Sequence, residues 1–259
     1  QGMNKLINGD KVFAMLLSLG TPMNIAAFKL QDAKNIPNVS PLSAARQMAE
    51  PFSPLHYAGT ATYYDQIRVG VTYLADLKGA DDADFVGALH KLSADGCDIV
   101  TLALGVRQAI TVSGTAKKLG LTDMHFLNSS AGFHTVMAKV PGGVTEGMYA
   151  AAGWADLLSR MDQPEVQKFF KRYTEATGEQ LPGTGAVLGH SGAMTLVKAL
   201  EAAGPDLDAK TFQAGMESLN YEDVVSGNTV TYSTTDHQGA DEVVISVIQD
   251  GNWVELARQ

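Results

Sequence analysis

The chain has 259 residues, of which 45% are hydrophobic and 18% are charged, and its formal net charge is −9 at pH 7. This length and composition are ordinary for a folded globular protein and allow one large domain or two small ones. The negative balance, without a run of Lys and Arg, argues against a nucleic-acid-binding surface, because phosphate binding needs clustered cations. The single cysteine, Cys97, excludes an intrachain disulfide and any CxxC metal or redox motif. The histidines show no metal-ligand spacing, so we expect no metal and no cofactor.

The first elements of the chain follow the order strand, turn, helix, strand. Residues 12–17 form an apolar run that predicts a buried strand, and residues 18–22 read Ser-Leu-Gly-Thr-Pro, which predicts a polar turn. A helix is predicted over residues 25–33 and a second strand over residues 36–39. This second strand also ends in a small polar loop, residues 40–44.

The two polar loops predict a binding site for a small anion. In a parallel α/β sheet, the loops at the carboxyl ends of adjacent strands lie at one edge, where such sheets bind ligands. Pro22 suits the first turn of a helix, and Thr21 before it is a fair N-cap. Hydroxyls and unpaired backbone N–H groups would therefore face one crevice, and a carboxylate suits such a site.

The central part of the chain contains an irregular junction. Residues 56–62 predict a short strand, and a helix is predicted over residues 64–77 from apolar residues at three- and four-residue spacing. A second amphipathic helix follows directly after Lys78 to Asp81, with no strand between the two helices. Either this is a helical hairpin or a segment has been left out.

Regular alternation resumes at Gly96. The predicted elements are a strand over residues 98–104, a loop over residues 105–108, a helix over residues 109–119, a strand over residues 124–127 and a loop over residues 128–132. Two adjacent strand ends again carry small polar loops, now with one cation, Arg107. The remaining elements are a strand over residues 147–154, helices over 165–177, 191–203 and 208–219, and a hairpin-like tail over 228–254 with its turn at Asp250-Gly251-Asn252.

Taken together, these segments resemble the type I periplasmic solute-binding proteins, specifically the branched-chain amino-acid-binding-like group that delivers ligand to ABC importers. The resemblance covers nearly the whole chain and rests on FAMLLSLGTPMN, AKNIPNVSPLSA, ADFVGALHKLSADGCDIVTLA, AMTLVKALEAAG and TTDHQGADEVVISVIQDGNWV. Members of the group normally begin with a strand–helix–strand block that is absent before Gln1. They also carry a strand–helix–strand segment of the second lobe where this chain passes from Lys78 to Asp81. We therefore expect that this sequence lacks an N-terminal block and part of lobe two.

The resemblance implies an α/β fold with two Rossmann-like lobes joined by a hinge and a ligand cleft between them. Lobe one would comprise residues 1–77 and 155–232, and lobe two residues 78–154 and 233–259. It also implies a non-enzymatic protein that works outside the cytoplasm after removal of a signal peptide. Its expected partners are a small carboxylate or amino-acid ligand and the membrane permease of an ABC importer, with the binding protein itself a monomer.

The ligand contacts that the resemblance implies lie in the strand-end loops. On lobe one these are Ser18, Gly20, Thr21, Ser43 and Ala44, whose hydroxyls and N–H groups would hold a carboxylate. On lobe two the matching positions are Val106 or Arg107 and Ser129 or Ser130, of which Arg107 and Ser130 are our candidates.

The lobe-two positions depart from the family pattern. Amino-acid-binding members tend to place a tyrosine and an acidic residue there to hold the ligand's ammonium group, and this chain does not. Because a buried ammonium without an anionic partner is costly, a ligand that lacks an α-amino group is favoured, with Arg107 paired to its carboxylate. The absent segment could supply an acid, so amino acids stay open.

Two other functions are compatible with parts of the sequence. Gly189-His190-Ser191-Gly192-Ala193 approximates the nucleophile elbow of a serine hydrolase, with Ser191 as nucleophile and an acid and His237 later in the chain. The elbow needs a strand immediately upstream, and only Ala186-Val187-Leu188 are present there. The second alternative is a ligand-sensing receptor domain, since the same fold serves both sensors and transporters.

Overall fold

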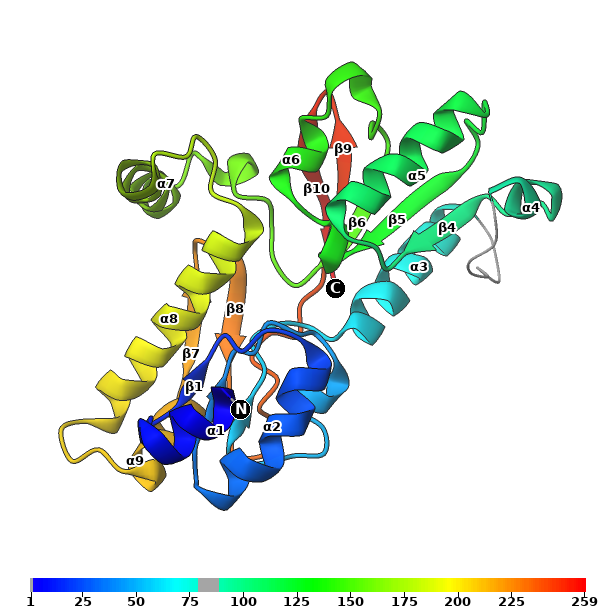
Figure 1. The fold of residues 1–259 in the computed structure, drawn as a ribbon. Coiled ribbons are helices and arrows are strands. Elements are labelled where there is room, and N and C mark those ends of the chain that lie inside the picture. Colours follow the sequence, from blue (N-terminus) through cyan, green and yellow to red (C-terminus); the bar gives the residue numbers. More distant parts are fainter. Residues whose placement is uncertain (1, 79–88) are drawn as a thin grey trace. The chain divides into compact units, whose positions relative to one another are not determined.

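The structure is a computed structural model that describes residues 2–78 and 89–259 (Figure 1). It divides the chain into two compact units, each formed from two separate stretches of sequence. Unit 1 consists of Gln1–Thr62 and Gly185–Asp241, and unit 2 of Tyr63–Thr184 and Glu242–Gln259. Among the described residues, no helix combines the length and apolarity that a membrane span requires.

Unit 1 is a small α/β unit in which short strands alternate with helices. Its elements in chain order are α1 (Gly2–Asn4), η1 (Lys5–Gly9), β1 (Met15–Leu16), α2 (Thr21–Ala33), β2 (Asn38–Val39), η2 (Arg46–Met48), β3 (His56–Tyr57), α8 (Thr184–Ala203), α9 (Ala209–Glu217), β7 (Asn220–Asp223) and β8 (Asn228–Thr231).

The sheet of unit 1 is parallel, in the order β1-β2-β3, with Leu16 opposite Val39 and Val39 opposite Tyr57. Parallel pairing places the loops after β1 and β2 at the same edge, as the sequence predicts. A further bridge joins Leu19 to Leu42 beyond the strand ends, so the two polar loops continue the pairing of their strands.

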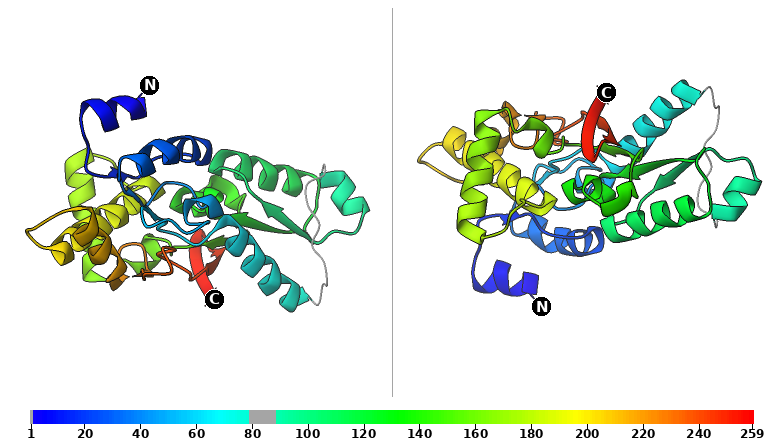
Figure 2. Two further views of the ribbon diagram at one scale, coloured as in Figure 1. Left: turned by 90° about the horizontal axis from the view of Figure 1, so that it is seen from below. Right: turned by 90° about the horizontal axis from the view of Figure 1, so that it is seen from above.

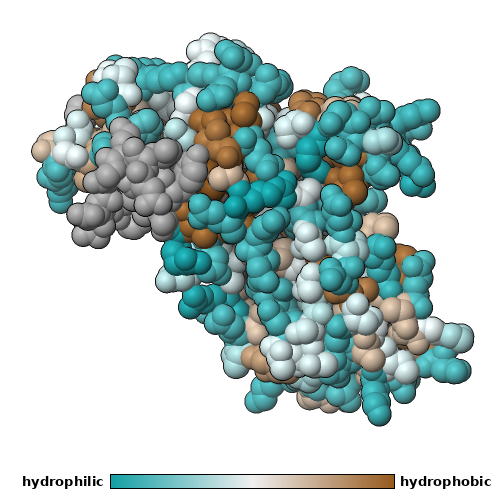
Figure 3. Space-filling model, turned by 180° about the vertical axis from the view of Figure 1, so that it is seen from behind, coloured by the Kyte–Doolittle hydropathy of each residue, from teal (hydrophilic) through white to brown (hydrophobic). Residues whose placement is uncertain are grey.

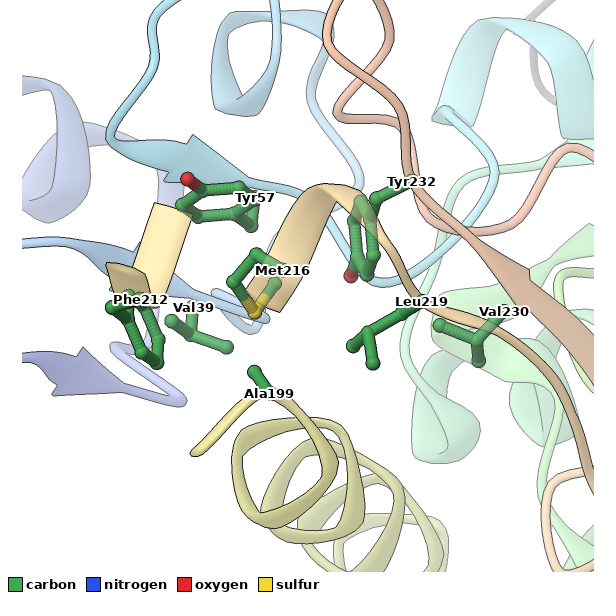
Figure 4. Close-up of a cluster of buried hydrophobic side chains, with 8 residues drawn as sticks. All are labelled: Val39, Tyr57, Ala199, Phe212, Met216, Leu219, Val230 and Tyr232. Carbon is green, nitrogen blue, oxygen red and sulfur yellow. The ribbon is translucent and has the colours of Figure 1, made fainter. Parts of the chain in front are cut away.

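The two residues of β2 face opposite sides of this sheet, because side chains alternate along a strand. Val39 packs with Ala199 of α8 and Phe212 of α9 in the hydrophobic core of unit 1. Figure 4 shows this cluster, whose buried members are Val39, Tyr57, Ala199, Phe212, Met216, Leu219, Val230 and Tyr232. Asn38 faces α2 on the other side, where it meets a second set of buried polar side chains.

Unit 2 contains a longer sheet and most of the short helical turns. Its elements are α3 (Tyr63–Lys78), α4 (Leu89–Ala94), β4 (Ile99–Leu102), α5 (Val106–Lys118), β5 (His125–Ser129), η3 (Ser130–Gly132), α6 (Thr135–Ala138), η4 (Pro141–Gly143), β6 (Tyr149–Ala152), η5 (Leu158–Arg160), α7 (Pro164–Thr177), β9 (Val244–Gln249) and β10 (Asn252–Arg258).

The sheet of unit 2 has the strand order β10-β9-β6-β5-β4. Strands β4, β5 and β6 are parallel, whereas β9 runs antiparallel to β6 and forms a hairpin with β10. Figure 2 shows α3 and α5 on opposite sides of this sheet. The predicted tail hairpin is confirmed for β9 and β10, but β8 pairs with β7 in a separate two-stranded sheet.

The bounds of the two units differ from the predicted lobes. Helix α3 was assigned to lobe one, but it packs on β5 and β6 of unit 2. At Gly70 an added Cβ would lie 2.6 Å from Leu127 Cδ2, so the helix approaches this sheet as closely as glycine allows. Residues 155–184 also belong to unit 2 rather than lobe one. Residues 233–241 belong to unit 1 because Gln238 bridges to Ala58 beside β3.

Several predicted elements have different bounds in the structure. The strand predicted over residues 12–17 is reduced to Met15–Leu16, and the helix predicted from Ser191 begins seven residues earlier, at Thr184. Helix α5 begins at Val106 rather than at Ala109. The irregular junction after Lys78 and the start of the second amphipathic helix lie outside the described residues; of that helix the structure describes Leu89–Ala94.

Candidate ligand-binding site

The predicted lobe-one residues meet at the carboxyl edge of the unit 1 sheet. Thr21 is the first residue of α2, and Ser43 follows the bridge residue Leu42 in the neighbouring loop. The hydroxyl oxygens of Thr21 and Ser43 lie 2.6 Å apart, a normal distance for an O–H···O hydrogen bond. The structure therefore brings together two residues that are 22 positions apart in sequence.

The hydroxyl pair keeps one hydrogen for a ligand. Two hydroxyls carry two hydrogens, and their mutual bond uses one of them. The Ser43 oxygen also accepts the N–H of Ala45 at 3.2 Å, which leaves the remaining hydroxyl hydrogen without a required role in the loop. Ser43 and Ala44 are each 6% exposed, and Thr21 is partly exposed, so the pair lies at the surface of a packed loop.

The start of α2 adds backbone donors to this edge. The first N–H groups of an α-helix have no acceptor within the helix, and they carry the positive end of its dipole. Gly20 is the N-cap residue with φ 90° and ψ 134°, a conformation that an L side chain rarely adopts. This glycine allows the chain to turn from β1 directly into the helix, so that Thr21 stands at the helix end.

Strands β1 and β2 are each followed directly by a residue with left-handed backbone geometry. Leu17 has φ 57° and Ser40 has φ 47°, and the register of β1 and β2 places these two residues side by side. Non-glycine residues with positive φ are uncommon, and such strain is concentrated at functional sites. Helix α8 covers this point closely, because a Cβ added at Gly192 would lie 2.8 Å from Leu17 Cδ2.

Apolar side chains flank the polar anchor. Leu19 is 74% exposed and Met23 is 71% exposed, one on each side of Thr21 in the sequence. On the face of the molecule in Figure 3, hydrophilic residues predominate and hydrophobic residues form separate patches. Two large apolar side chains with this exposure beside a hydroxyl pair are consistent with contact to a ligand that has a non-polar part.

In unit 2, as in unit 1, a helix start and a polar turn follow the carboxyl ends of two adjacent parallel strands, here β4 and β5. Gly105 is the N-cap of α5, and Arg107 is the second helical residue, with an exposed side chain. The prediction of a loop at residues 106–108 is therefore wrong: these residues form the first turn of the helix, because Gly105 already caps it. The Arg107 side chain leaves from the helix start and not from a strand-end loop.

Ser130 begins the short turn η3 directly after β5, and it is 7% exposed. Its N–H donates to Gln66 Oε1 at 3.1 Å, which fixes the backbone at this position to α3. The neighbouring Ser129 belongs to the strand, is 1% exposed, and its hydroxyl has no hydrogen-bond partner among the described residues.

The loops after β4 and β5 approach one another closely. A Cβ added at Gly132 would lie 3.1 Å from the Leu104 carbonyl oxygen and 2.6 Å from Asn128 Oδ1. Only glycine fits at this point, which brings the start of α5 and the turn η3 into contact. Arg107, in the first turn of α5, and Ser130, in η3, thus lie on neighbouring segments of unit 2, on a different unit from Thr21 and Ser43.

A second polar cluster lies at the other end of the unit 1 sheet. His56 Nε2 contacts Asp32 Oδ1 at 2.9 Å, and His237 Nε2 contacts Glu217 Oε1 at 3.2 Å. Burial lowers the pKa of His56 below its ordinary value. The neighbouring Asp32 carboxylate raises this pKa and so opposes the effect of burial, whereas His237 lowers it further. Burial also raises the pKa of Tyr57, which stacks on the His237 ring. Within residues 2–78 and 89–259, no group of three His, Cys, Asp or Glu side chains could hold a metal ion.

The hydrolase interpretation conflicts with this geometry. Ser191 lies inside α8, seven residues after the helix begins, and not on a turn between a strand and a helix. His237 is committed to a structural role, because its Nδ1 faces the carbonyl oxygens of Ser53 and His56 and its Nε2 faces Glu217. Residues 189–193, considered as an alternative nucleophile elbow, therefore form part of a continuous helix and not an elbow.

Two cavities of unit 2 involve none of the predicted site residues. One has a volume of about 250 Å³ and is lined by Thr135, Ala138, Lys139, Asp156, Leu158, Ser159, Asn252 and Trp253. Its Asp156 carboxylate already accepts the Thr135 hydroxyl and two backbone N–H groups. The other, of about 340 Å³, lies beside Cys97 at the amino ends of β4 and β5.

Sequence reasoning did not identify the residue that organises the turn before α2. Asn24 is completely buried, and its Nδ2 donates to the carbonyl oxygens of Ser18 at 2.8 Å and Gly20 at 2.9 Å. An asparagine in a helical segment is ordinarily read as a surface residue. The one available signal was its position four residues after Gly20, where a helical side chain lies above the first turn.

The chain is similar to known transport proteins. A family model described as periplasmic binding protein matches residues 79–252, which is more than half of the chain. No curated protein sequence matches the chain significantly.

Solved structures with the same fold cover nearly all of the chain. A branched-chain amino acid ABC transporter protein from Thermus thermophilus with bound valine has a TM-score of 0.83 at 16% identity, over 99% of this chain and 80% of that one. A fatty acid ABC transporter substrate-binding protein from Thermomonospora curvata has a TM-score of 0.76 at 21% identity, over 92% and 72%. A solute-binding protein of R. palustris in complex with benzoate has a TM-score of 0.74 at 17% identity, over 99% and 80%.

Proposed function

This chain belongs to the periplasmic binding protein family, and we propose that it binds a small carboxylate-bearing solute and delivers it to an ABC importer. The ligand carboxylate is held on unit 1 by the hydroxyls of Thr21 and Ser43 and by N–H groups at the start of α2. Binding requires no covalent chemistry, and the protein acts outside the cytoplasm with the permease as its membrane partner.

The observation that carries this proposal is the hydroxyl pair. The Thr21 and Ser43 oxygens lie 2.6 Å apart on two loops that follow adjacent parallel strands. At this edge of an α/β sheet, a helix N-terminus and a free hydroxyl hydrogen together offer donors only. A carboxylate, which has acceptor oxygens only, is the head group that matches them.

The proposed ligand class is a monocarboxylate with an apolar body. Leu19 and Met23 supply exposed apolar surface next to Thr21 and are proposed to contact the hydrocarbon part. On unit 2, Arg107 and Ser130 are proposed ligand contacts, and a guanidinium can pair with a carboxylate in a bidentate manner. Neither position offers an anion for an α-ammonium group, which favours aliphatic or aromatic carboxylates over amino acids.

The test is a thermal-shift and calorimetric screen against benzoate, 3,4-dihydroxybenzoate, octanoate and L-valine. A ligand that binds only the folded state raises the melting temperature. We expect a shift with at least one carboxylate and none with its neutral amide, for example benzamide. A melting temperature that is unchanged by all four compounds would contradict the proposed ligand class.

Two single variants then test the site. Thr21→Ala and Ser43→Ala are each expected to weaken carboxylate binding by roughly 1–3 kcal/mol, because each removes a donor to a charged group. Thr231→Ala is the control, since Thr231 is an exposed hydroxyl residue of β8 in the same unit. Affinities of both site variants equal to that of the control would remove the assignment of the anchor to this edge.

A further inference from the structure

Three buried amide side chains form a chain of hydrogen bonds between α2 and β2, which reaches the turn that precedes Thr21. Asn24, Gln31 and Asn38 are each 0% exposed. Asn38 Nδ2 donates to Asn24 Oδ1 at 2.9 Å and lies 3.4 Å from Gln31 Oε1. Asn24 Nδ2 donates in turn to the backbone at the end of β1. Gln31 and Asn24 come from α2 and Asn38 from β2, so this amide chain joins the helix to the sheet.

The direction of these bonds determines how Asn24 meets the turn. A primary amide has a donor end and an acceptor end. Because Asn38 presents a donor to Asn24, the oxygen of Asn24 must face β2 and its nitrogen must face the turn. Both hydrogens of that nitrogen are then used, one on the Ser18 carbonyl and one on the Gly20 carbonyl.

The two carbonyls are thereby drawn away from the ligand edge. The Gly20 carbonyl also accepts the N–H of Asn24 at 3.1 Å, and the Ser18 carbonyl also accepts the N–H of Leu42 at 3.0 Å. Each of these two carbonyls therefore accepts two hydrogen bonds inside unit 1, and the groups at the edge that can donate to a ligand are the hydroxyl pair and the first N–H groups of α2.

We propose that Asn24 is a positioning residue of the carboxylate anchor, which makes the anchor selective for an anionic head group by holding the Ser18 and Gly20 carbonyls inward. This inference rests on the proposed function, because it assigns selectivity to the same site. Asn24 does not touch the ligand. It acts through the turn: without its side-chain amide each of the two carbonyls keeps only its backbone N–H partner, and the lone pair that is released can accept from an amide ligand and repels a carboxylate.

The test compares Asn24→Ala and Asn24→Asp with the unchanged chain, using benzoate or octanoate, whichever binds, and the matching amide. We expect at least a tenfold loss of carboxylate affinity in both variants, and a smaller ratio between the dissociation constants of the amide and the carboxylate. A purely structural role would weaken both compounds equally. An unchanged ratio would therefore overturn the proposal.

Asn24→Asp adds a pH-dependent readout. At pH 8.0 the introduced carboxylate faces two carbonyl oxygens without a hydrogen, whereas the protonated carboxyl group at lower pH can donate to one of them. The ligand stays ionised at both pH 8.0 and pH 5.5. We expect carboxylate affinity of this variant to recover several-fold at pH 5.5, with no such recovery in the unchanged chain. Equal affinity of the variant at both pH values would count against the mechanism.

Asn228→Ala is the matched control, because Asn228 is also a buried asparagine of unit 1. It lies in β8, 6% exposed, and accepts the Ser226 hydroxyl at 2.7 Å. We expect this variant to lower the melting temperature without changing either dissociation constant or their ratio. A change of the ratio in Asn228→Ala would show that selectivity follows general stability, and would overturn the role of Asn24.

A ligand-independent measurement separates this inference from the proposed function. The Gly20 N–H donates to the Leu42 carbonyl at 3.3 Å, and the Leu42 N–H donates to Ser18. Amide hydrogen exchange at Gly20 and Leu42 is expected to accelerate at least tenfold in Asn24→Ala and to remain unchanged in Asn228→Ala. If Thr21→Ala and Ser43→Ala weaken carboxylate binding but Asn24→Ala changes neither the hydrogen exchange nor the selectivity, the inference about Asn24 is wrong and the proposed function stands. If exchange responds and no carboxylate binds, the proposed function fails.

Discussion

His56 Nε2 lies 2.9 Å from Asp32 Oδ1, at the end of α2 opposite to Thr21. The imidazole ring of His56 is stacked on Phe28 with ring centroids 3.9 Å apart, and the residue is 7% exposed. The helix that presents Thr21 at the ligand edge is therefore also tied to the start of β3 through its last turn.

The pKa of His56 predicts acid sensitivity of unit 1. Burial lowers this pKa below the ordinary value of 6.5, so the unfolded chain binds a proton at higher pH than the folded chain does. The free energy of unfolding must then fall as pH decreases through about 6.5, and the loss is complete below the folded-state pKa. Urea denaturation at pH 7.5 and pH 5.0 should show the difference.

Asp32→Asn gives a second test of whether His56 causes this acid sensitivity, because Asp32 raises the pKa of His56 and so opposes the effect of burial. Its removal should lower that pKa further and enlarge the loss of stability on acidification. His56→Gln should reduce the loss. A pH dependence that is identical in both variants and the unchanged chain would mean that His56 does not contribute.

Gly215→Ala tests the close contact between α8 and α9. A Cβ at Gly215 would lie 2.5 Å from the Ala199 carbonyl oxygen and 3.0 Å from the Ala203 nitrogen, both backbone atoms. Because the backbone cannot yield as a side chain does, we expect a loss of about 1–3 kcal/mol of stability. Gly189→Ala is the control within α8, since a Cβ there meets nothing within 4 Å. It should gain up to about 1 kcal/mol from helix propensity. Chemical denaturation curves of the two variants should move in opposite directions.

Phe212→Ala tests the core of unit 1. Phe212 is 0% exposed and meets the Phe13 ring edge to face, with centroids 5.3 Å apart. Truncation leaves a cavity in the cluster of Figure 4 and should remove about 3–5 kcal/mol of stability. Phe52→Ala, at a side chain that is 49% exposed, should remove clearly less. Similar denaturation midpoints for the two variants would be inconsistent with this description of the core.

Arg107→Gln tests the proposed contact on unit 2. If the guanidinium pairs with the ligand carboxylate, its removal should weaken binding by about 1.5–3 kcal/mol, the range for hydrogen bonds to charged groups. Lys118→Gln changes the net charge equally and lies at the last residue of the same helix, also exposed. Calorimetric titration of both variants with the bound carboxylate should show a loss for Arg107 alone. An equal effect in both would indicate only long-range charge attraction.

Some features of the site could be predicted from local sequence. The turn at residues 18–22 and the loop at residues 40–44 were expected to meet, because strands joined by a helix are parallel and their carboxyl ends share an edge. Thr21 and Ser43 do meet there, at hydrogen-bonding distance. The start of α5 was misplaced because the turn reads as polar loop, although Gly105 already caps the helix and Arg107 lies in its first turn.

The sequence by itself determined the α/β class, the alternation of strands and helices, and the polar strand ends that carry the anchor. These follow from periodicity and turn chemistry, which act over a few residues. Only the tertiary structure decided that α3 packs in unit 2, that Asn24 and Asn38 are buried partners, and that His237 is bonded to Glu217. The physical reason is that the sequence alone does not distinguish a polar side chain that faces water from one that faces a buried partner. Its burial depends on which distant segment supplies the matching donor or acceptor.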